Sequence, residues 1–233
     1  MTQCSIAVTF TSLKELPTKE LGKLSRPEIA RASEFRSPNR QQEYLCGRAM
    51  LRTVLEQFTG EPAASHEITS NDDGKPFCVQ GPAISIAHSG DLVVCAVTDQ
   101  GQIGVDVEIP DRRRNTTRIA NEYFAADESR WLSSQPADRF YMLWVLKEAW
   151  LKAKGTGIAG GLDRLRCVVT PPKIEVLISD DAIPKLSLHT IESALIGVAT
   201  TTALQTTLII NRWEPITGRI EEYNNAQLIA TSV

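Results

Sequence analysis

The sequence predicts an α+β protein in which a group of helices precedes a group of antiparallel strands, twice along the chain. Two observations support this class. Apolar residues recur at helical spacing in two regions, and each region is followed by short β-branched runs bounded by turn residues. A chain of 233 residues with 42% hydrophobic content can bury a substantial core, as one large domain or two small ones.

The first half begins with a predicted strand over residues 1–10 and a helix over residues 27–35. A longer helix follows, because Ser37 and Pro38 supply a cap and a first-turn proline, and Gly60 ends the periodic pattern. We then expect an antiparallel meander, with strands around Cys78 and over residues 84–87, 92–98 and 103–108.

The second half repeats this order. Its helices are expected over residues 116–124, 127–132 and 136–154, and its strands over residues 165–169, 174–178, 186–189, 194–199 and 206–210. The composition changes most sharply at the polar, arginine-rich stretch after Glu108. We therefore place the boundary between the halves there, which gives residues 1–108 and 109–233.

The predicted strand over residues 103–108 carries two carboxylates on one face. Strand alternation places Asp106 and Glu108 side by side, while Val105 and Val107 point into a core. Neighbouring like charges resist desolvation unless a cation or water compensates them. Oxygen-only ligation favours Mg²⁺, with Mn²⁺ as the alternative metal. An edge strand with a solvated acidic face would produce the same pattern.

The predicted helix over residues 136–154 places charges inside a very apolar pattern. Glu148 and Lys152 lie four residues apart and share one side of this helix. The alternative to a functional role is an ordinary ion pair at helical spacing. Lys147 projects about 100° away from Glu148 around the helix axis, so packing and catalysis are equal candidates for its role.

Two further segments favour a phosphate ligand. The run N-D-D-G-K-P at residues 71–76 is a turn by composition, with Gly74 suited to positive φ and Lys75 at its exit. Residues 84–97 form a predicted hairpin, with His88 where the strand meets its turn. The alternative is that His88, one of three histidines in the chain, is structural or simply exposed, as is usual for a turn lysine.

Together these segments resemble a known family. The order G-K-P, I-S-I-A-H-S-G, I-G-V-D-V-E and W-x-x-K-E-A-x-x-K-A-x-G-x-G, from Gly74 to Gly157, is similar to that of the large, Sfp-type 4′-phosphopantetheinyl transferases of the holo-acyl-carrier-protein synthase superfamily. The resemblance implies transfer of 4′-phosphopantetheine from coenzyme A to a serine of apo acyl or peptidyl carrier proteins. It also implies two similar α+β halves related by a pseudo-twofold axis, with coenzyme A between them.

The resemblance implies roles for individual residues. Asp106, Glu108 and Glu148 would hold the metal against the pyrophosphate of coenzyme A, and Lys152 would contact the same phosphates. Glu148, the candidate general base, Lys152 and His88 are the implied catalytic residues. A protonated His88 would face the 3′-phosphate. Coenzyme A would be bound by Lys152 and by basic and hydroxyl residues of the first half, namely Arg31, Arg40, Arg48, Lys75, His88 and Ser89. For each of the three arginines, the alternative is an ordinary exposed position on a helix.

Charge and composition exclude other classes. A net charge of −3 and a pI near 5.7 disfavour nucleic-acid binding, and with it a metal-dependent nuclease or nucleotidyltransferase. The sequence has no run of eighteen apolar residues and no leader pattern at Met1, so we expect a cytoplasmic protein without a membrane partner. Five cysteines without a C-x-x-C pair predict reduced, mostly buried thiols.

The alternative function is a non-enzymatic homologue that binds coenzyme A or a carrier protein. The intact set of Asp106, Glu108, Glu148 and Lys152 argues against it, because none of these side chains serves packing well. Both halves are present in one chain, so we expect a monomer. The arginine run at residues 112–114 is expected to be a solvated loop or a contact for an acidic partner.

Overall fold

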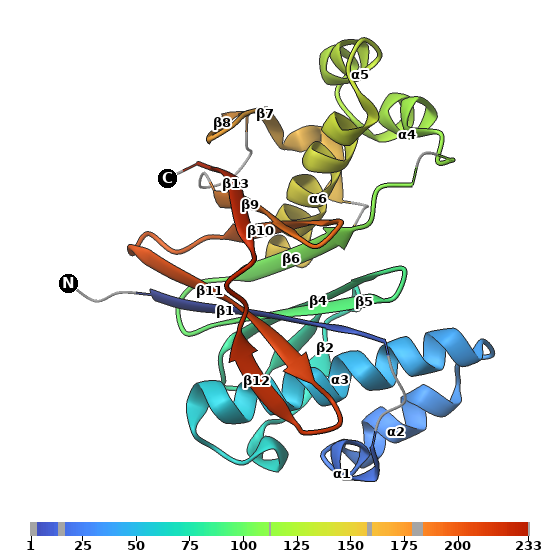
Figure 1. Cartoon of the computed structure of the whole chain (residues 1–233), viewed down its shortest axis with the longest axis vertical. Coiled ribbons are helices and arrows are strands. Elements are labelled where there is room, and N and C mark those ends of the chain that lie inside the picture. The colour runs from blue at the N-terminus through green and yellow to red at the C-terminus, as the bar shows by residue number, and fades with distance from the viewer. Residues whose placement is uncertain (1–3, 14–16, 112, 158–159, 179–183, 233) are drawn as a thin grey trace.

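Two sheets packed face to face lie between two long helices (Figure 1). The structure is a computed structural model and describes residues 4–13, 17–111, 113–157, 160–178 and 184–232. The start of the predicted first strand, residues 1–3, and Arg112 of the arginine run lie outside the described residues.

The described first part of the chain holds five strands, three α-helices and one 3-10 helix. Its elements are β1 (Cys4–Ser12), α1 (Thr18–Leu21), α2 (Arg26–Ser33), α3 (Pro38–Thr59), the 3-10 helix η1 (Ala63–Ser65), β2 (Ile68–Ser70), β3 (Pro76–Cys78), β4 (Ala83–Ser89) and β5 (Leu92–Thr98). The second part holds β6 (Ile103–Glu108), α4 (Thr116–Tyr123), α5 (Ala126–Leu132), α6 (Ala137–Lys154), the 3-10 helix η3 (Leu162–Arg164), β7 (Arg166–Thr170), β8 (Lys173–Ile178), β9 (Lys185–Ile191), β10 (Ala194–Thr200), β11 (Thr206–Glu214), β12 (Arg219–Glu222) and β13 (Gln227–Thr231).

The core has a helix, sheet, sheet, helix order of layers. One sheet has the strand order β12-β11-β1-β5-β4 and is covered on its outer face by α3. The other has the order β6-β10-β9-β13-β8-β7 and is covered by α6. A third apolar cluster, from β1 and β5 on one side and β6 and β10 on the other, joins the two sheets. Because an apolar cluster lies between each pair of neighbouring layers, the layers should fold as one unit.

The two halves repeat one arrangement. In the first, β5 lies antiparallel between β1 and β4, and in the second, β10 lies antiparallel between β6 and β9. In each half the long helix follows the first of these strands and precedes the other two. The predicted α+β fold of two similar halves is confirmed.

A buried ion pair is also repeated. Arg52 of α3 bonds Glu28 of α2 at 2.7 Å and donates to carbonyl groups at and just after η1. Lys147 of α6 bonds Glu128 of α5 at 2.7 Å and donates to carbonyl groups at and just after η3. In each half, therefore, one cation ties the long helix to a preceding helix and to the following 3-10 turn.

Strand pairing differs from the expectation in two places. β6 was expected in a meander of the first half, but it pairs with β10 of the second sheet. β11 returns to the first sheet and pairs in parallel with β1. When the repeats are divided by strand pairing, the second repeat begins at Ile103 and not after Glu108. Hydrogen bonding to a distant strand, and not local composition, determines which sheet a strand joins.

Several local expectations are confirmed. The side chain of Ser37 caps α3, and Gly60 ends it at a φ of 77°. The five cysteines, all within the described residues, are buried free thiols. Short elements without a clear pattern were not predicted, namely α1, η1, β2, η3, β12 and β13. Among the helices described, none is both long and apolar enough to span a membrane.

Candidate active site

The candidate site begins on β6, whose two faces have different surroundings. Val105 and Val107 are buried in the cluster between the sheets, as strand alternation predicted. Gly104, Asp106 and Glu108 lie on the opposite face, towards α6. A Cβ at Gly104 would lie 1.8 Å from the carbonyl oxygen of Ala149, so only glycine lets α6 approach this closely.

The carboxylates of β6 are held by cations and by a hydroxyl group. Lys152 Nζ lies 2.6 Å from Asp106 Oδ1. Arg114 Nη1 lies 2.8 Å from Glu108 Oε1, and Ser89 Oγ donates to Glu108 Oε2 at 2.9 Å. The structure thus brings Asp106 and Lys152 together, and it places the Ser89 hydroxyl on Glu108.

The third carboxylate, Glu148, belongs to the same electrostatic group. Burial raises the pKa of Glu148, and the negative charges of Asp106 and Glu108 raise this pKa further, against Lys152 and Arg114. Burial also raises the pKa of Asp106, against the nearby charge of Lys152. Three partly desolvated carboxylates that repel one another would gain from additional positive charge.

Asp106, Glu108 and Glu148 have the donor atoms that a hard divalent cation needs. In this structure, however, Asp106 and Glu108 are paired with Lys152 and Arg114 and are not arranged around a metal site. The donors are oxygen atoms only, which suits Mg²⁺ or Mn²⁺. However, within the described part of the chain, no three His, Cys, Asp or Glu side chains form a group arranged to hold a metal ion. Lys152 and Arg114 occupy oxygen atoms that a metal would need, so ligation would require these ion pairs to open.

A pocket of about 630 Å³ adjoins this site on the first half. Its lining includes Arg31, Arg40, Arg48 and His88, so the structure gathers these predicted ligands in one place. Arg48 is 8% exposed, and its Nη1 is a buried donor without a hydrogen-bond partner in the described structure. A buried guanidinium nitrogen without a partner is costly, and an anion in this pocket would remove that cost.

The other basic residues of this pocket have partners. Arg31 is 60% exposed and pairs with Glu34. Arg40 Nη1 lies 2.9 Å from Glu43 and 2.8 Å from His88 Nε2. A guanidinium can only donate, so His88 Nε2 accepts this bond and the imidazole is neutral in this arrangement.

Burial lowers the pKa of His88, and the charges of Arg40 and Lys152 lower it further, against Glu43 and Glu108. The protonated His88 implied by the resemblance would therefore need an added negative charge beside the ring, such as a phosphate. Protonation of His88 therefore stays an expectation.

A second pocket of about 240 Å³ links the two regions. It is lined by Lys75, Glu148 and Lys152, and it shares Gly74 and Pro76 with the larger pocket. Gly74 has a φ of 82°, as the turn composition predicted. Lys75 Nζ donates to the carbonyl oxygen of Ala153 at 2.9 Å, and burial lowers the pKa of Lys75 to about 8.

Lys147 has a structural environment. It is fully buried, its ammonium lies 4.8 Å from the centre of the Phe124 ring, and it is paired with Glu128. Sequence reasoning missed the partners Arg114, Glu43 and Glu128. The sequence did carry a signal for Arg114, because a run of arginines follows the strand with the two carboxylates. It carried none for Glu43 and Glu128, whose partners come close only in the folded chain.

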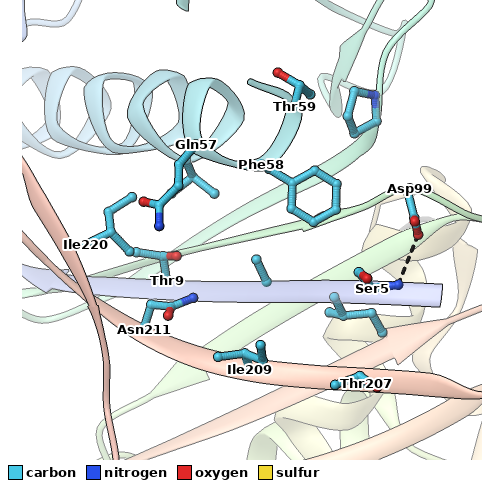
Figure 2. Close-up of a pocket in the computed structure, with 14 residues that line it drawn as sticks. Ser5, Thr9, Gln57, Phe58, Thr59, Asp99, Thr207, Ile209, Asn211 and Ile220 are labelled. Carbon is cyan, nitrogen blue, oxygen red and sulfur yellow. Dashed lines mark hydrogen bonds between the residues drawn. The ribbon is translucent and has the colours of Figure 1, made fainter. Parts of the chain in front are cut away.

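The first half holds the structural counterpart of this site. When the two halves are aligned on their hairpin turns and on the glycines that end α3 and α6, Asp106, Glu108, Glu148 and Lys152 correspond to uncharged residues, namely Thr9, Thr11, Thr53 and Gln57. A pocket of about 590 Å³ lies there, and Figure 2 shows Gln57 of α3 pointing towards Thr9 and Asn211 of the sheet. Its described lining residues include no lysine, arginine or histidine, so this pocket is poorly suited to phosphate.

Comparisons with known proteins agree with this geometry. The family model of the 4′-phosphopantetheinyl transferase superfamily matches residues 102–199, and that of the 4′-phosphopantetheinyl transferase N-terminal domain matches residues 29–98. The two matches meet between β5 and β6, where the strand pairing divides the repeats. The chain belongs to the 4′-phosphopantetheinyl transferase superfamily, a family of transferases.

Similar curated proteins carry the same description. The chain is 31% identical to the 4′-phosphopantetheinyl transferase HetI of Nostoc sp., over 76% of this chain and 78% of HetI. It is 35% identical to psf-1 of Bacillus pumilus, over 57% of this chain and 58% of the relative. It is 34% identical to a Bacillus subtilis 4′-phosphopantetheinyl transferase, over 51% and 54%. The last two matches span little more than half of each relative.

Proposed function

We propose that this chain transfers the 4′-phosphopantetheine group of coenzyme A to a serine hydroxyl of an apo carrier protein, with Mg²⁺ and with release of 3′,5′-ADP. The observation that carries the proposal is the junction of a basic pocket with a carboxylate site. The pocket that holds Arg48, whose Nη1 has no partner among the described residues, adjoins the pocket lined by Glu148 and Lys152. Coenzyme A is a ligand with separate phosphate groups that such a pair of pockets can hold.

The larger pocket would bind the 3′-phosphate end of coenzyme A. Arg48 can donate from a buried guanidinium without breaking an existing ion pair, and charge-assisted bonds to phosphate are the stronger kind. Arg40 and His88 lie beside it, and Arg40 would exchange part of its contact with Glu43 for the phosphate. Arg31 would add an exposed charge at the rim.

The carboxylate site would act on the pyrophosphate. Asp106, Glu108 and Glu148 would hold Mg²⁺, which supplies positive charge against the phosphate oxygens as the bond to 3′,5′-ADP breaks. Lys152 would leave Asp106 and donate to the same phosphate group, which keeps its ammonium paired throughout. Lys75, on the opposite wall of the pocket, is available as a further donor.

Glu148 would accept the proton of the attacking serine, directly or through a water. The serine oxygen forms a bond to the phosphorus of the phosphopantetheine group, and the bond from that phosphorus to the oxygen of 3′,5′-ADP breaks. Burial and the nearby carboxylates raise the pKa of Glu148, which favours proton uptake. Metal ligation would lower the basicity of Glu148, so its share of the proton transfer depends on how closely it approaches the metal.

The test is to incubate the protein with coenzyme A, Mg²⁺ and a panel of purified apo carrier proteins, and to weigh the carriers by mass spectrometry. We expect at least one carrier to gain the mass of one phosphopantetheine group, and we expect a chelator to prevent this gain. Coenzyme A binding without modification of any carrier would instead support the non-enzymatic alternative.

A further inference from the structure

A turn of the first half lies against the end of the catalytic helix of the second. Asn71 Nδ2 donates to the carbonyl oxygen of Gly155 at 3.0 Å, and Lys75 Nζ donates to that of Ala153 at 2.9 Å. Both carbonyls belong to the C-terminal end of α6, one turn or less beyond Lys152. These bonds join residues that are 84 and 78 positions apart in the chain.

The end of α6 needs such donors. The last carbonyl groups of a helix have no partner within it, and they carry its negative end. Gly155 also makes room for the turn, because a Cβ at this position would lie 3.2 Å from Asn71 Nδ2 and 3.1 Å from Lys75 Cδ. With a φ of 78°, Gly155 is both the left-handed cap of α6 and the contact point for the turn.

Asn71 fixes the turn and the helix with one side chain. While its nitrogen donates to Gly155, its Oδ1 accepts the backbone N–H of Lys75 at 2.8 Å. The same turn contributes Gly74 and Lys75 to the pocket that Glu148 and Lys152 line. The side chain of Asn71 thus connects the two walls of that pocket without lining it.

We propose that Asn71 is a positioning residue that sets the separation between the turn at residues 71–75 and the catalytic end of α6, and thereby the affinity for the phosphates of coenzyme A. This inference rests on the proposed function, because it takes the pocket between them to be the pyrophosphate site. Lys75 alone would hold the helix less well, because its long side chain is flexible and fixes distance poorly, whereas the short amide of Asn71 bonds the turn and the helix at once.

The test compares Asn71→Ala and Asn71→Asp with Asp72→Ala, an exposed neighbour in the same turn. We expect Asn71→Ala to raise the KM for coenzyme A about fivefold to tenfold while kcat stays within about twofold, because one hydrogen bond on each wall is lost. Asn71→Asp should be at least as impaired, since a carboxylate would face the negative end of α6. Asp72→Ala should match wild type.

Three outcomes separate the possibilities. A lower melting temperature and lower kcat with an unchanged KM in Asn71→Ala would mean a merely structural role and would overturn the inference. Calorimetric titration with coenzyme A alone, without a carrier, should show the same fivefold to tenfold weakening. This measurement does not depend on a carrier. If the wild-type protein modified no carrier, only the proposed transfer would be overturned, and weaker coenzyme A binding by Asn71→Ala would still support the role of Asn71.

Discussion

Arg48 is the residue whose surroundings point most directly to an anion. Its Nη1 is buried without a described partner, while its guanidinium lies 5.3 Å from the centre of the Tyr44 ring. We expect Arg48→Met, which keeps the packing, to raise the KM for coenzyme A about tenfold to one-hundredfold, the cost of a charge-assisted bond. The rise should be much smaller with 3′-dephospho-coenzyme A.

The matched control for Arg48→Met is Arg31→Ala. Arg31 is 60% exposed and already paired, so its loss should change the KM by less than about threefold. Equal losses for coenzyme A and its dephospho form in Arg48→Met would show that this arginine does not read the 3′-phosphate.

We expect Asp106 and Glu148 to contribute to catalysis and, as buried charges, to lower the free energy of unfolding. Burial raises the pKa of both, so their charged forms are disfavoured by the fold itself. We therefore expect Asp106→Ala and Glu148→Gln to remain folded by circular dichroism while losing at least about one-hundredfold in kcat. Chelation of wild type should mimic both variants. Near-wild-type turnover of either variant at saturating Mg²⁺ would contradict the assigned metal site.

His189 provides a pH dependence away from the site. Burial lowers its pKa from 6.5 to about 4, so the unfolded chain binds this proton first as the pH falls. The free energy of unfolding should therefore decrease between about pH 6.5 and pH 4, by at most about 3 kcal/mol from this residue. His189→Gln should show a correspondingly smaller decrease in urea titrations at about pH 7 and about pH 4.5. Parallel curves for variant and wild type would refute this.

At the scale of elements, the packing of α6 on β6 depends on glycine. A Cβ at Gly104 would meet backbone atoms of α6, which cannot rotate away as a side chain could. We expect Gly104→Ala to lower the free energy of unfolding by about 3 kcal/mol and to reduce kcat in the protein that still folds, because α6 carries Glu148 away from Asp106. Gly22→Ala is the control and should have a much smaller effect, because the nearest atom to a Cβ there, the carbonyl oxygen of Lys19, lies 3.3 Å away.

Elements with local signals were predictable from the sequence. The cap at Ser37, the turn glycine at Gly74 and the alternation around Asp106 each act within a few residues, and each appears in the structure as expected. Pairings between distant strands were not predictable in this way, since the pattern of β6 is compatible with either sheet. The same holds within the site: Lys152 follows from helical spacing, but its bond to Asp106 and the pairing of Arg114 with Glu108 arise only in the folded chain.

At the scale of the whole molecule, one chain supplies both walls of the site. Arg48 and His88 come from the first half and Glu148 from the second. We expect a monomer whose specific activity is constant on dilution, because no second copy is needed to complete the pocket. Light scattering over a dilution series, with activity measured at each point, checks this. Activity that falls together with particle mass would show a site shared between chains.

The parallel pairing of β1 with β11 also bears on how the protein is made. β1 is paired along Cys4–Phe10 with residues 206–212, which a ribosome synthesises some two hundred residues later. During translation the outer edge of β1 therefore remains open, with backbone groups and apolar side chains able to pair with another chain. Completion of the first sheet must then wait for a strand about two hundred residues further along the chain, so a nascent chain that stalls in the second half would leave this sheet unfinished.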